Sequence, residues 1–315
     1  MRITRVLAAL SLATAALSAH AGPQFINIVT GGTTGVYYPL GVALSQVFGK
    51  EIANVKTSVQ ATKGSAENAN LLQSGRGELG FALADAVADA WKGDAEAGFK
   101  APLDKLRAVA GIYPNYIHLV ASADSGIRTL ADLKGKRISV GAPKSGTELN
   151  ARAILRAAGL AYGDFAKVEY LPYGESVELI KNRQLDVTLL SSGLGVAAIR
   201  DLSTSVKVVF VPVPADVVAR VGSAAYQVGT IPANTYQGQS ADVHTVQIRN
   251  VLVTHADVPE DTVHAMTKAL FGSLDHLSSA HSAARAISLE TAADGLPVPL
   301  HPGAARFYRE AGVGH

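Results

Sequence analysis

The sequence predicts an α/β protein of two lobes joined by two crossing strands. One reason is a repeated order of apolar strand, glycine-rich or polar loop and helix, which is typical of α/β folds. Another is a pair of long extended apolar stretches, Leu106–Ser122 and residues 245–253, which separate the blocks of this repeat. The 315 residues, 48% of them hydrophobic, also exceed one ordinary domain of ~100–200 residues. We therefore expect one lobe of residues 22–119 plus 248–315 and a second lobe of residues 120–247.

The elements can be justified in chain order. Residues 25–29 alternate and are β-branched, residues 30–35 supply turn residues, and residues 38–48 have helical spacing with Pro39 near the start. The same patterns predict strands at 55–60, 79–83, 136–141, 167–171 and 187–191, and helices at 67–73, 148–159, 174–182 and 259–277. Strand carboxyl ends and helix N-termini converge where such folds bind ligands, so we expect a ligand at the seam between the lobes.

The first segment has the pattern of an export signal. Arg2 and Arg5 precede the apolar run 6–17, and Ala19-His20-Ala21 has the A-x-A form of a cleavage site. The apolar run is shorter than the ~20 residues that span a bilayer. We expect residues 1–21 to be a signal peptide cleaved near Ala21, and the remaining protein to be unanchored and periplasmic.

Charge and cysteine content exclude several classes of protein. Of the 28 basic residues, Arg2 and Arg5 lie in the signal, so the rest balance the 26 acidic residues. The charges are interspersed, which gives no support for binding nucleic acid or anionic lipid. The chain has no cysteine, which removes disulfides, thiolate metal sites and cysteine nucleophiles.

Two glycine motifs resemble nucleotide-binding loops without meeting their requirements. Residues 75–80 fit G-x-G-x-x-G but lead from a helix into a strand, the reverse of the dinucleotide-binding order. Residues 141–147 resemble a phosphate-binding loop, yet Thr147-Glu148 stands where a Lys-Ser/Thr pair should follow. The histidine pairs His255/His264 and His276/His281 lack the i, i+4 spacing of a zinc helix. We expect no cofactor, no metal and no catalytic residue.

Residues 142–147 have the stereochemistry of an anion receptor. Hydroxyl residues and a glycine between a strand and a helix direct backbone N–H groups, the positive end of the helix dipole and hydroxyl donors to one point. We therefore expect Ser145 and Thr147 to hold a carboxylate of the ligand. The alternative is an ordinary N-cap in which Ser145 or Thr147 bonds its own helix. The loops 30–35 and 62–68 are similar in kind.

Six segments, in order and in register, resemble the solute receptors of the TAXI class of TRAP transporters. They are residues 33–41, 62–68, 106–114, 131–137, 145–152 and 294–304. The resemblance extends from about residue 25 to the end of the chain. It implies a type II periplasmic-binding-protein fold whose lobes close on one small carboxylate, a glutamate-like amino acid or a related dicarboxylate such as 2-oxoglutarate. It also implies a monomer that delivers this ligand to TRAP permease subunits, separate or fused, driven by an ion gradient.

The family's cleft loops fall on residues 32–38, 62–68 and 143–147, the loops already selected above. The expected ligand-binding residues are Gly32, Thr33, Thr34, Gly35, Tyr37, Tyr38, Thr62, Gly64, Ser65, Asn68, Asp85, Pro143, Ser145, Gly146, Thr147, Ser192 and Gly193.

Two departures from the family pattern concern the ligand. Leu83 and Ala84 replace a polar pair before Asp85, and residues 191–195 replace a Gly-Pro-Pro run. A buried ammonium needs a carboxylate or several carbonyls, and Asp85 is the acid placed by family position. This favours glutamate ahead of 2-oxoglutarate. The alternative is that Asp85 only caps the helix that follows it.

Two other functions remain as alternatives to a transport receptor. A binding protein that reports to a signalling sensor would use the same fold. A periplasmic enzyme acting on small acids is less favoured, because no G-x-S-x-G motif or clustered Ser-His-acid set is present in the sequence.

Overall fold

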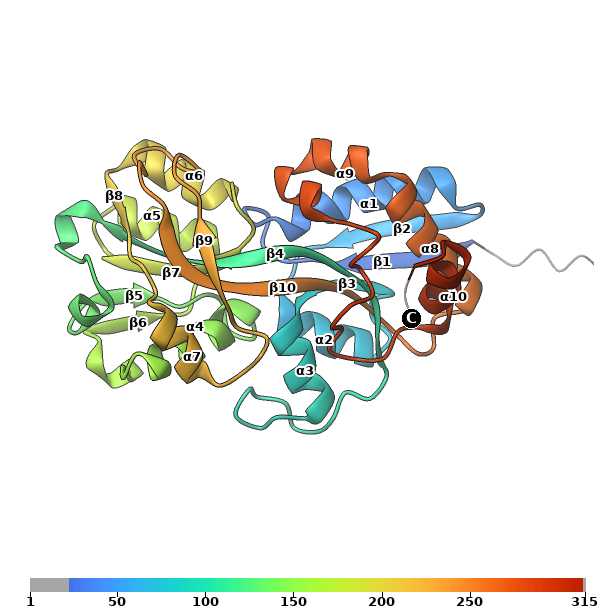
Figure 1. Cartoon of the computed structure of the whole chain (residues 1–315), viewed down its shortest axis with the longest axis horizontal. Helices are drawn as coiled ribbons and strands as arrows, with labels where there is room; N and C mark the ends of the chain where they lie inside the picture. The colour runs from blue at the N-terminus through green and yellow to red at the C-terminus, as the bar shows by residue number, and fades with distance from the viewer. Residues whose placement is uncertain (1–22, 314–315) are drawn as a thin grey trace, which may run out of the picture.

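A computed structural model of the chain describes residues 23–313. Figure 1 shows two α/β lobes side by side, with two long strands running through both. The first lobe holds β1–β3, α1–α3 and α8–α10, and the second holds β5–β9 and α4–α7. The predicted export signal lies outside the described residues, and the residue limits of the lobes stay a prediction.

One continuous sheet joins the lobes, in the strand order β2-β1-β3-β10-β4-β7-β5-β6, with β8 paired to β4 and β9 to β10. The strands are β1 Gln24–Val29, β2 Val55–Gln60, β3 Leu79–Leu83, β4 Leu106–Ser122, β5 Arg137–Ser139, β6 Lys167–Glu169, β7 Val187–Ser192, β8 Val208–Phe210, β9 Gln227–Ile231 and β10 Val243–His255. The strands β1, β2 and β3 pair in parallel, as do β5, β6 and β7. Each lobe therefore gathers its parallel strand ends at one edge.

The crossing strands β4 and β10 are antiparallel to one another and to the parallel strands. The C-terminal part of β10 pairs with β3 in the first lobe, and its N-terminal part pairs with β9 in the second. The last residues of β4 pair with β7 and β8. The two long extended stretches predicted from the sequence are thus the two connections through the sheet.

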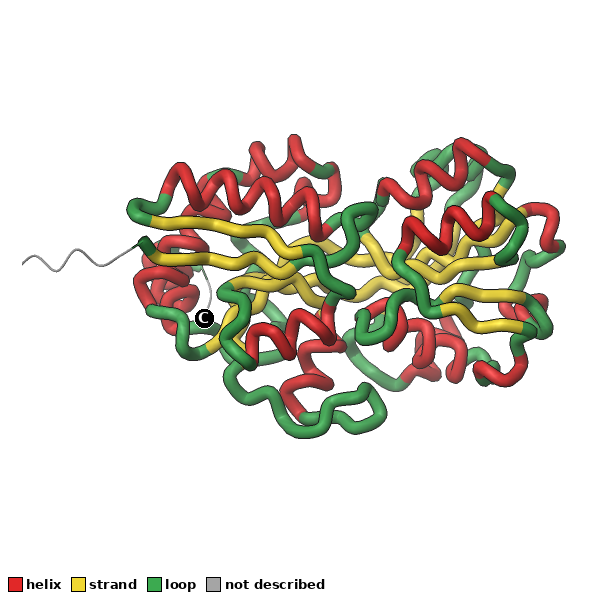
Figure 2. The backbone as a smooth tube through the Cα atoms, turned by 180° about the vertical axis from the view of Figure 1, so that it is seen from behind, coloured by secondary structure: helices red, strands yellow, loops and turns green. Residues whose placement is uncertain are grey.

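Helices cover both faces of the sheet, as Figure 2 shows from behind. They are α1 Tyr37–Glu51, α2 Ser65–Gln73, α3 Ala84–Lys92, α4 Gly146–Ala157, α5 Tyr173–Lys181, α6 Ala197–Ser205, α7 Ala215–Val221, α8 Glu260–Gly272, α9 Leu274–Ala280 and α10 Pro302–Glu310. Within residues 23–313, no helix is both long enough and apolar enough to cross a membrane.

The alternating strand pattern produces two apolar cores, one on each face. Val29 and Leu189 belong to one core, and their neighbours Ile28 and Leu190 belong to the other. Successive side chains of a strand point to opposite faces, so strands covered on both faces are apolar at every position. The central strand β3 is accordingly buried along its whole length.

Several predicted boundaries differ from those of the structure, and three helices show the reasons. The helix α2 begins at Ser65 and α4 at Gly146, so parts of the predicted polar loops are first helical turns. The single helix predicted over 259–277 is two helices separated at Ser273. Helical periodicity continues across that break, and the sequence pattern therefore did not reveal it.

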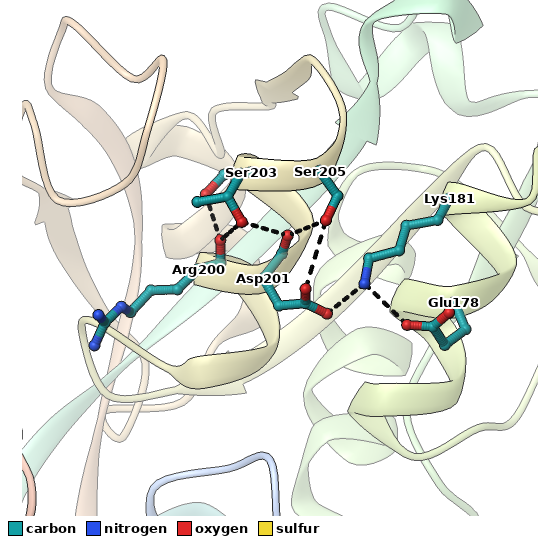
Figure 3. A network of polar contacts seen from close by, with 7 residues as sticks. Glu178, Lys181, Arg200, Asp201, Ser203 and Ser205 are labelled. Atoms are coloured by element: carbon teal, nitrogen blue, oxygen red, sulfur yellow. Dashed lines mark hydrogen bonds and ion pairs between the residues drawn. The ribbon is translucent and has the colours of Figure 1, made fainter.

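A surface ion network joins α5 to α6 in the second lobe (Figure 3). The Lys181 ammonium lies 2.9 Å from the Glu178 carboxylate on its own helix and 2.5 Å from the Asp201 carboxylate on α6. Both acids are more than half exposed, so we expect little stability from this network.

We predict that Leu190→Ala lowers the free energy of unfolding by about 2–5 kcal/mol, because it leaves a cavity at a fully buried position of β7. Asp201→Asn on the same lobe is the control and should cost less than about 1 kcal/mol. Urea denaturation measures both. Equal losses for the two variants would contradict this assignment of the core.

Candidate functional site

A cavity of about 720 Å³, counting the space at its mouth, lies at the seam of the lobes. Its walls come from the junctions β1–α1, β2–α2, β5–α4 and β6–α5, together with the ends of β3 and β7 and a residue of β4. The lining residues are Gly31, Gly32, Gly35, Val36, Tyr37, Thr62, Lys63, Gly64, Ser65, Leu83, Asn115, Ala142, Ser145, Gly146, Thr147, Pro172, Tyr173, Ser191 and Ser192.

Four helices begin at this cavity, two from each lobe. The residues at the N-termini of α1, α2, α4 and α5 all belong to its lining. An α-helix leaves its first backbone N–H groups without intrahelical acceptors, and its N-terminus carries a partial positive charge. The cavity is therefore suited to an anion.

Glycines allow the backbone to approach closely around the cavity. Gly141 has φ +93°, and a Cβ at this position would lie 2.6 Å from the Thr147 Cγ2. Gly64, before α2, has φ +110°. Residues with a side chain rarely adopt such angles, so both positions favour glycine.

The hydroxyl of Thr147 already has a partner. It lies 2.6 Å from the Tyr173 hydroxyl, which donates to the backbone carbonyl of Ser191 at 2.6 Å. Because Tyr173 has one proton, Thr147 is the donor between the two hydroxyls. Its side chain is thus committed to a neighbouring element of the same lobe in this structure, which leaves its backbone N–H at the helix start to face a ligand.

Ser145 is the N-cap of α4, as the alternative interpretation expected. Its Oγ accepts a hydrogen bond from the Glu148 N–H at 3.1 Å. Ser65, at the start of α2, similarly accepts from the Leu83 N–H at 3.1 Å. An N-capping hydroxyl still has its own proton to donate, so capping and ligand binding are compatible.

Neutral side chains behind the cavity hold each other in place. The Tyr37 hydroxyl donates to the Asn250 Oδ1 at 2.6 Å, and the Asn250 Nδ2 donates to the Asn115 Oδ1 at 2.9 Å. Asn115 donates in turn to the Ser191 Oγ at 3.1 Å. Burial raises the pKa of Tyr37 well above its usual value and that of Tyr173 to about 12, so both remain uncharged donors.

Lys63 is the charged residue of the lining; the other described lining residues are neutral. Its backbone N–H donates to the Glu67 carboxylate at 2.7 Å, and no ion pair of its ammonium appears within residues 23–313. Sequence reasoning selected the loop 62–68 but not this residue. A basic residue near the start of a loop that is expected to bind an anion could have marked Lys63 as a candidate ligand-binding residue.

The structure brings most of the predicted site residues together. Those that line the cavity are Gly32, Gly35, Tyr37, Thr62, Gly64, Ser65, Ser145, Gly146, Thr147 and Ser192. Asn115 and Tyr173 also line it and were missed, because they come from distant parts of the sequence with no motif around them.

Six other predicted residues lie outside the lining. Thr33 and Tyr38 face a surface depression beside α9, and Pro143 faces another beside Tyr162. The Thr34 carbonyl accepts from the Ala198 N–H of the second lobe at 3.3 Å. Asn68 is fully buried, and its amide donates to the carbonyls of Thr30 and Phe81. Gly193 packs against Tyr113 and Ala283.

Asp85 also lies outside the lining, and its carboxyl group faces side chains of the second lobe. It is buried in the first turn of α3, and its Oδ2 accepts hydrogen bonds from the second lobe. Burial raises the pKa of Asp85, against hydrogen bonds from Tyr226 and Asn150 that lower it, and Leu83 rather than Asp85 is the N-cap residue of α3. The preference for glutamate depended on Asp85 and loses its physical basis.

The lobes touch at several points around the cavity. The Glu67 N–H donates to the Lys144 carbonyl at 3.1 Å, and the Arg152 guanidinium donates to the Glu96 carbonyl at 2.5 Å. A Cβ at Gly146 would lie 2.6 Å from both the Ser65 Oγ and the Leu83 Cδ1. These contacts describe a closed arrangement of the lobes.

We predict that Gly146→Val holds the lobes apart, because its side chain would overlap Ser65 and Leu83 of the first lobe. Small-angle X-ray scattering should give a larger radius of gyration than for the wild type. Gly163→Val on the surface of the same lobe, where a Cβ meets nothing within 4 Å, is the control. An unchanged radius for Gly146→Val would contradict the predicted overlap.

Comparison with known proteins supports this fold. A solved structure described as a periplasmic transporter is 12% identical, with a TM-score of 0.58 over 91% of this chain and 92% of that one. A protein of Bordetella bronchiseptica RB50 is 15% identical (TM-score 0.56; 91% and 98% covered), and a putative L-cystine ABC transporter protein of Listeria monocytogenes is 13% identical (0.51; 84% and 98%). The two-lobe binding-protein fold is thus confirmed.

The model of the NMT1-like family matches residues 28–312, and the chain belongs to this family.

Proposed function

We propose that the protein is an exported solute-binding component of a membrane transporter, and that it holds a small carboxylate between its lobes. The observation that carries this proposal is the convergence of four helix N-termini, two from each lobe, on one cavity. A ligand bound at this position contacts both lobes and so stabilises the closed arrangement by its differential affinity for it.

The lining supports binding more than catalysis. Among the described lining residues there is no histidine, aspartate or glutamate, and the tyrosines are held neutral by burial. General acid–base catalysis needs a group that titrates near the working pH, and nucleophilic catalysis needs an activated nucleophile with a base. The hydroxyls of Ser65, Ser145 and Thr147 bond to backbone groups and a tyrosine instead.

The same lining favours an acid without an ammonium group. An ammonium in a closed cleft costs several kcal/mol unless it is paired, and the described lining offers it Lys63 and no carboxylate. A 2-oxo acid or dicarboxylate instead gains N–H and hydroxyl donors at both walls. We therefore place 2-oxoglutarate ahead of glutamate as the ligand, which reverses the preference drawn from the sequence.

The partner follows from the sequence resemblance. We propose that the protein delivers its ligand in the periplasm to permease subunits of the TRAP type. The family membership and the fold support a receptor for some membrane transporter. The likeness to the L-cystine ABC transporter protein is at 13% identity and bears on the fold alone.

A thermal-shift series tests the ligand class. We expect 2-oxoglutarate and simple dicarboxylates to raise the melting temperature, glutamate to raise it less, and a neutral diamide of the same length to leave it unchanged. A specific ligand at 100 times its Kd stabilises the folded state by about 2.7 kcal/mol. If glutamate alone raised the melting temperature, the ammonium argument would be contradicted. If none of the acids raised it, the proposed function would be contradicted.

We predict that Lys63→Gln weakens dicarboxylate binding about ten- to a hundred-fold. The expected cause is the loss of a charge-assisted hydrogen bond of roughly 1.5–3 kcal/mol. Lys144→Gln is the matched control, because Lys144 lies on the facing loop outside the cavity lining. Isothermal titration calorimetry with 2-oxoglutarate measures both, and equal effects in the two variants would contradict a role for Lys63.

A further inference from the structure

Three side chains form a buried polar cluster across the lobes, beside the cavity. The Asp85 Oδ2, on α3 of the first lobe, accepts from the Asn150 Nδ2 at 2.6 Å and from the Tyr226 hydroxyl at 2.7 Å. Asn150 also donates to the Tyr226 hydroxyl oxygen at 2.9 Å. Asn150 lies on α4, and Tyr226 lies just before β9. Asp85 therefore comes from the first lobe, and Asn150 and Tyr226 come from the second.

The cluster can form only when the lobes meet. Leu83, two residues before Asp85, and Thr147, three residues before Asn150, both line the cavity. One side of the cluster thus lies on α4, whose start encloses the ligand site, and the other lies on α3, directly after the end of β3 that contributes Leu83 to the lining. When the lobes separate, the Asp85 carboxyl loses both partners from the second lobe and gains water.

The cluster holds more acceptors than donors. The Asp85 Oδ1 and the Asn150 Oδ1 are both buried without a hydrogen-bond partner. Asp85 is 5% exposed and Asn150 is fully buried. A carboxylate in such surroundings keeps its charge only at a large desolvation cost, whereas a carboxyl group with a proton supplies one more donor.

The charged neighbours do not offset that cost. The ionisable groups that act electrostatically with Asp85 are Asp89 on its own helix, Tyr226 and, from α1, Tyr37. Of the cations on the adjoining elements, Lys92 acts on Asp89, and Arg152 of α4 pairs with Glu148 at 2.6 Å. Burial raises the pKa of Asp85, against the opposing effect of its hydrogen bonds.

We propose that the lobes close with Asp85 in its neutral, protonated form, so that closure takes up one proton from solvent and opening releases it. The proton resides on the Asp85 carboxyl group, within a cluster whose other donors leave two buried oxygens without a partner. This inference goes beyond the proposed function and does not depend on which solute is bound.

The sign of the pH dependence follows from this coupling. Below the usual aspartate pKa of ~3.9, both the open and the closed form hold the proton, and closure is at its strongest. As the pH rises from there through the higher pKa of the closed form, the ratio of closed to open molecules falls by up to about tenfold per pH unit. Above that pKa the ratio is again constant.

Small-angle X-ray scattering without any ligand tests the proposal. The wild type should have a larger radius of gyration at about pH 8 than at about pH 5. Asp85→Asn keeps the shape of the neutral carboxyl group without a titratable proton, and it should have the same radius at both pH values. Asp89→Asn is the matched control on the same helix and should keep the pH response, although the pKa of Asp89 is itself raised to about 6 by burial.

Two results would overturn the proposal: a wild-type radius that does not change with pH, or the same change in Asp85→Asn. A second variant covers the case in which Asp85→Asn fails to fold. Tyr226→Phe removes the hydroxyl from the facing lobe and leaves Asp85 in place, so it should be more extended than the wild type at about pH 5. A radius equal to the wild type at that pH would also count against the cluster. Because no ligand is present, these outcomes are independent of the thermal-shift series.

Discussion

The antiparallel pairing of β4 with β10 is the interaction on which the rest of the structure depends. It joins the parallel strands of both lobes into one sheet. The parallel strands of each lobe therefore end at the same seam, and the helices that follow them begin there. The strands β4 and β10 each cross once between the lobes, so the lobes share one sheet. Around the cavity they meet through individual hydrogen bonds and packing contacts, which can separate.

The properties of the site follow from that geometry. Each helix N-terminus contributes roughly 0.3–1 kcal/mol toward a nearby anion, so four of them together make a substantial preference, although the lining within residues 23–313 includes no arginine. The buried tyrosines and asparagines are neutral and hold one another in place by hydrogen bonds, which fixes the shape of the cavity wall. Asp85 lies outside the cavity and accepts hydrogen bonds from the second lobe. The site is thus positive on balance, as a carboxylate requires.

Much of the fold could be predicted from the sequence, because strand alternation and helix spacing are local. The crossing strand Leu106–Ser122 was predicted to the residue. The loops that form the cavity were also local signals, since hydroxyl residues and glycine mark a helix start. What could not be predicted depends on the approach of distant segments. Tyr173 reaches Thr147 only in the folded chain, and Asp85 meets Asn150 only across the seam.

The most direct test of the account is a crystal structure of the protein with 2-oxoglutarate. The account predicts one carboxylate within hydrogen-bonding distance of the backbone N–H groups at the start of α4 or α2, with Lys63 near the second carboxylate. It also predicts that the lobes are closed around the ligand. A ligand bound outside the seam, or a carboxylate held away from every helix N-terminus, would contradict it.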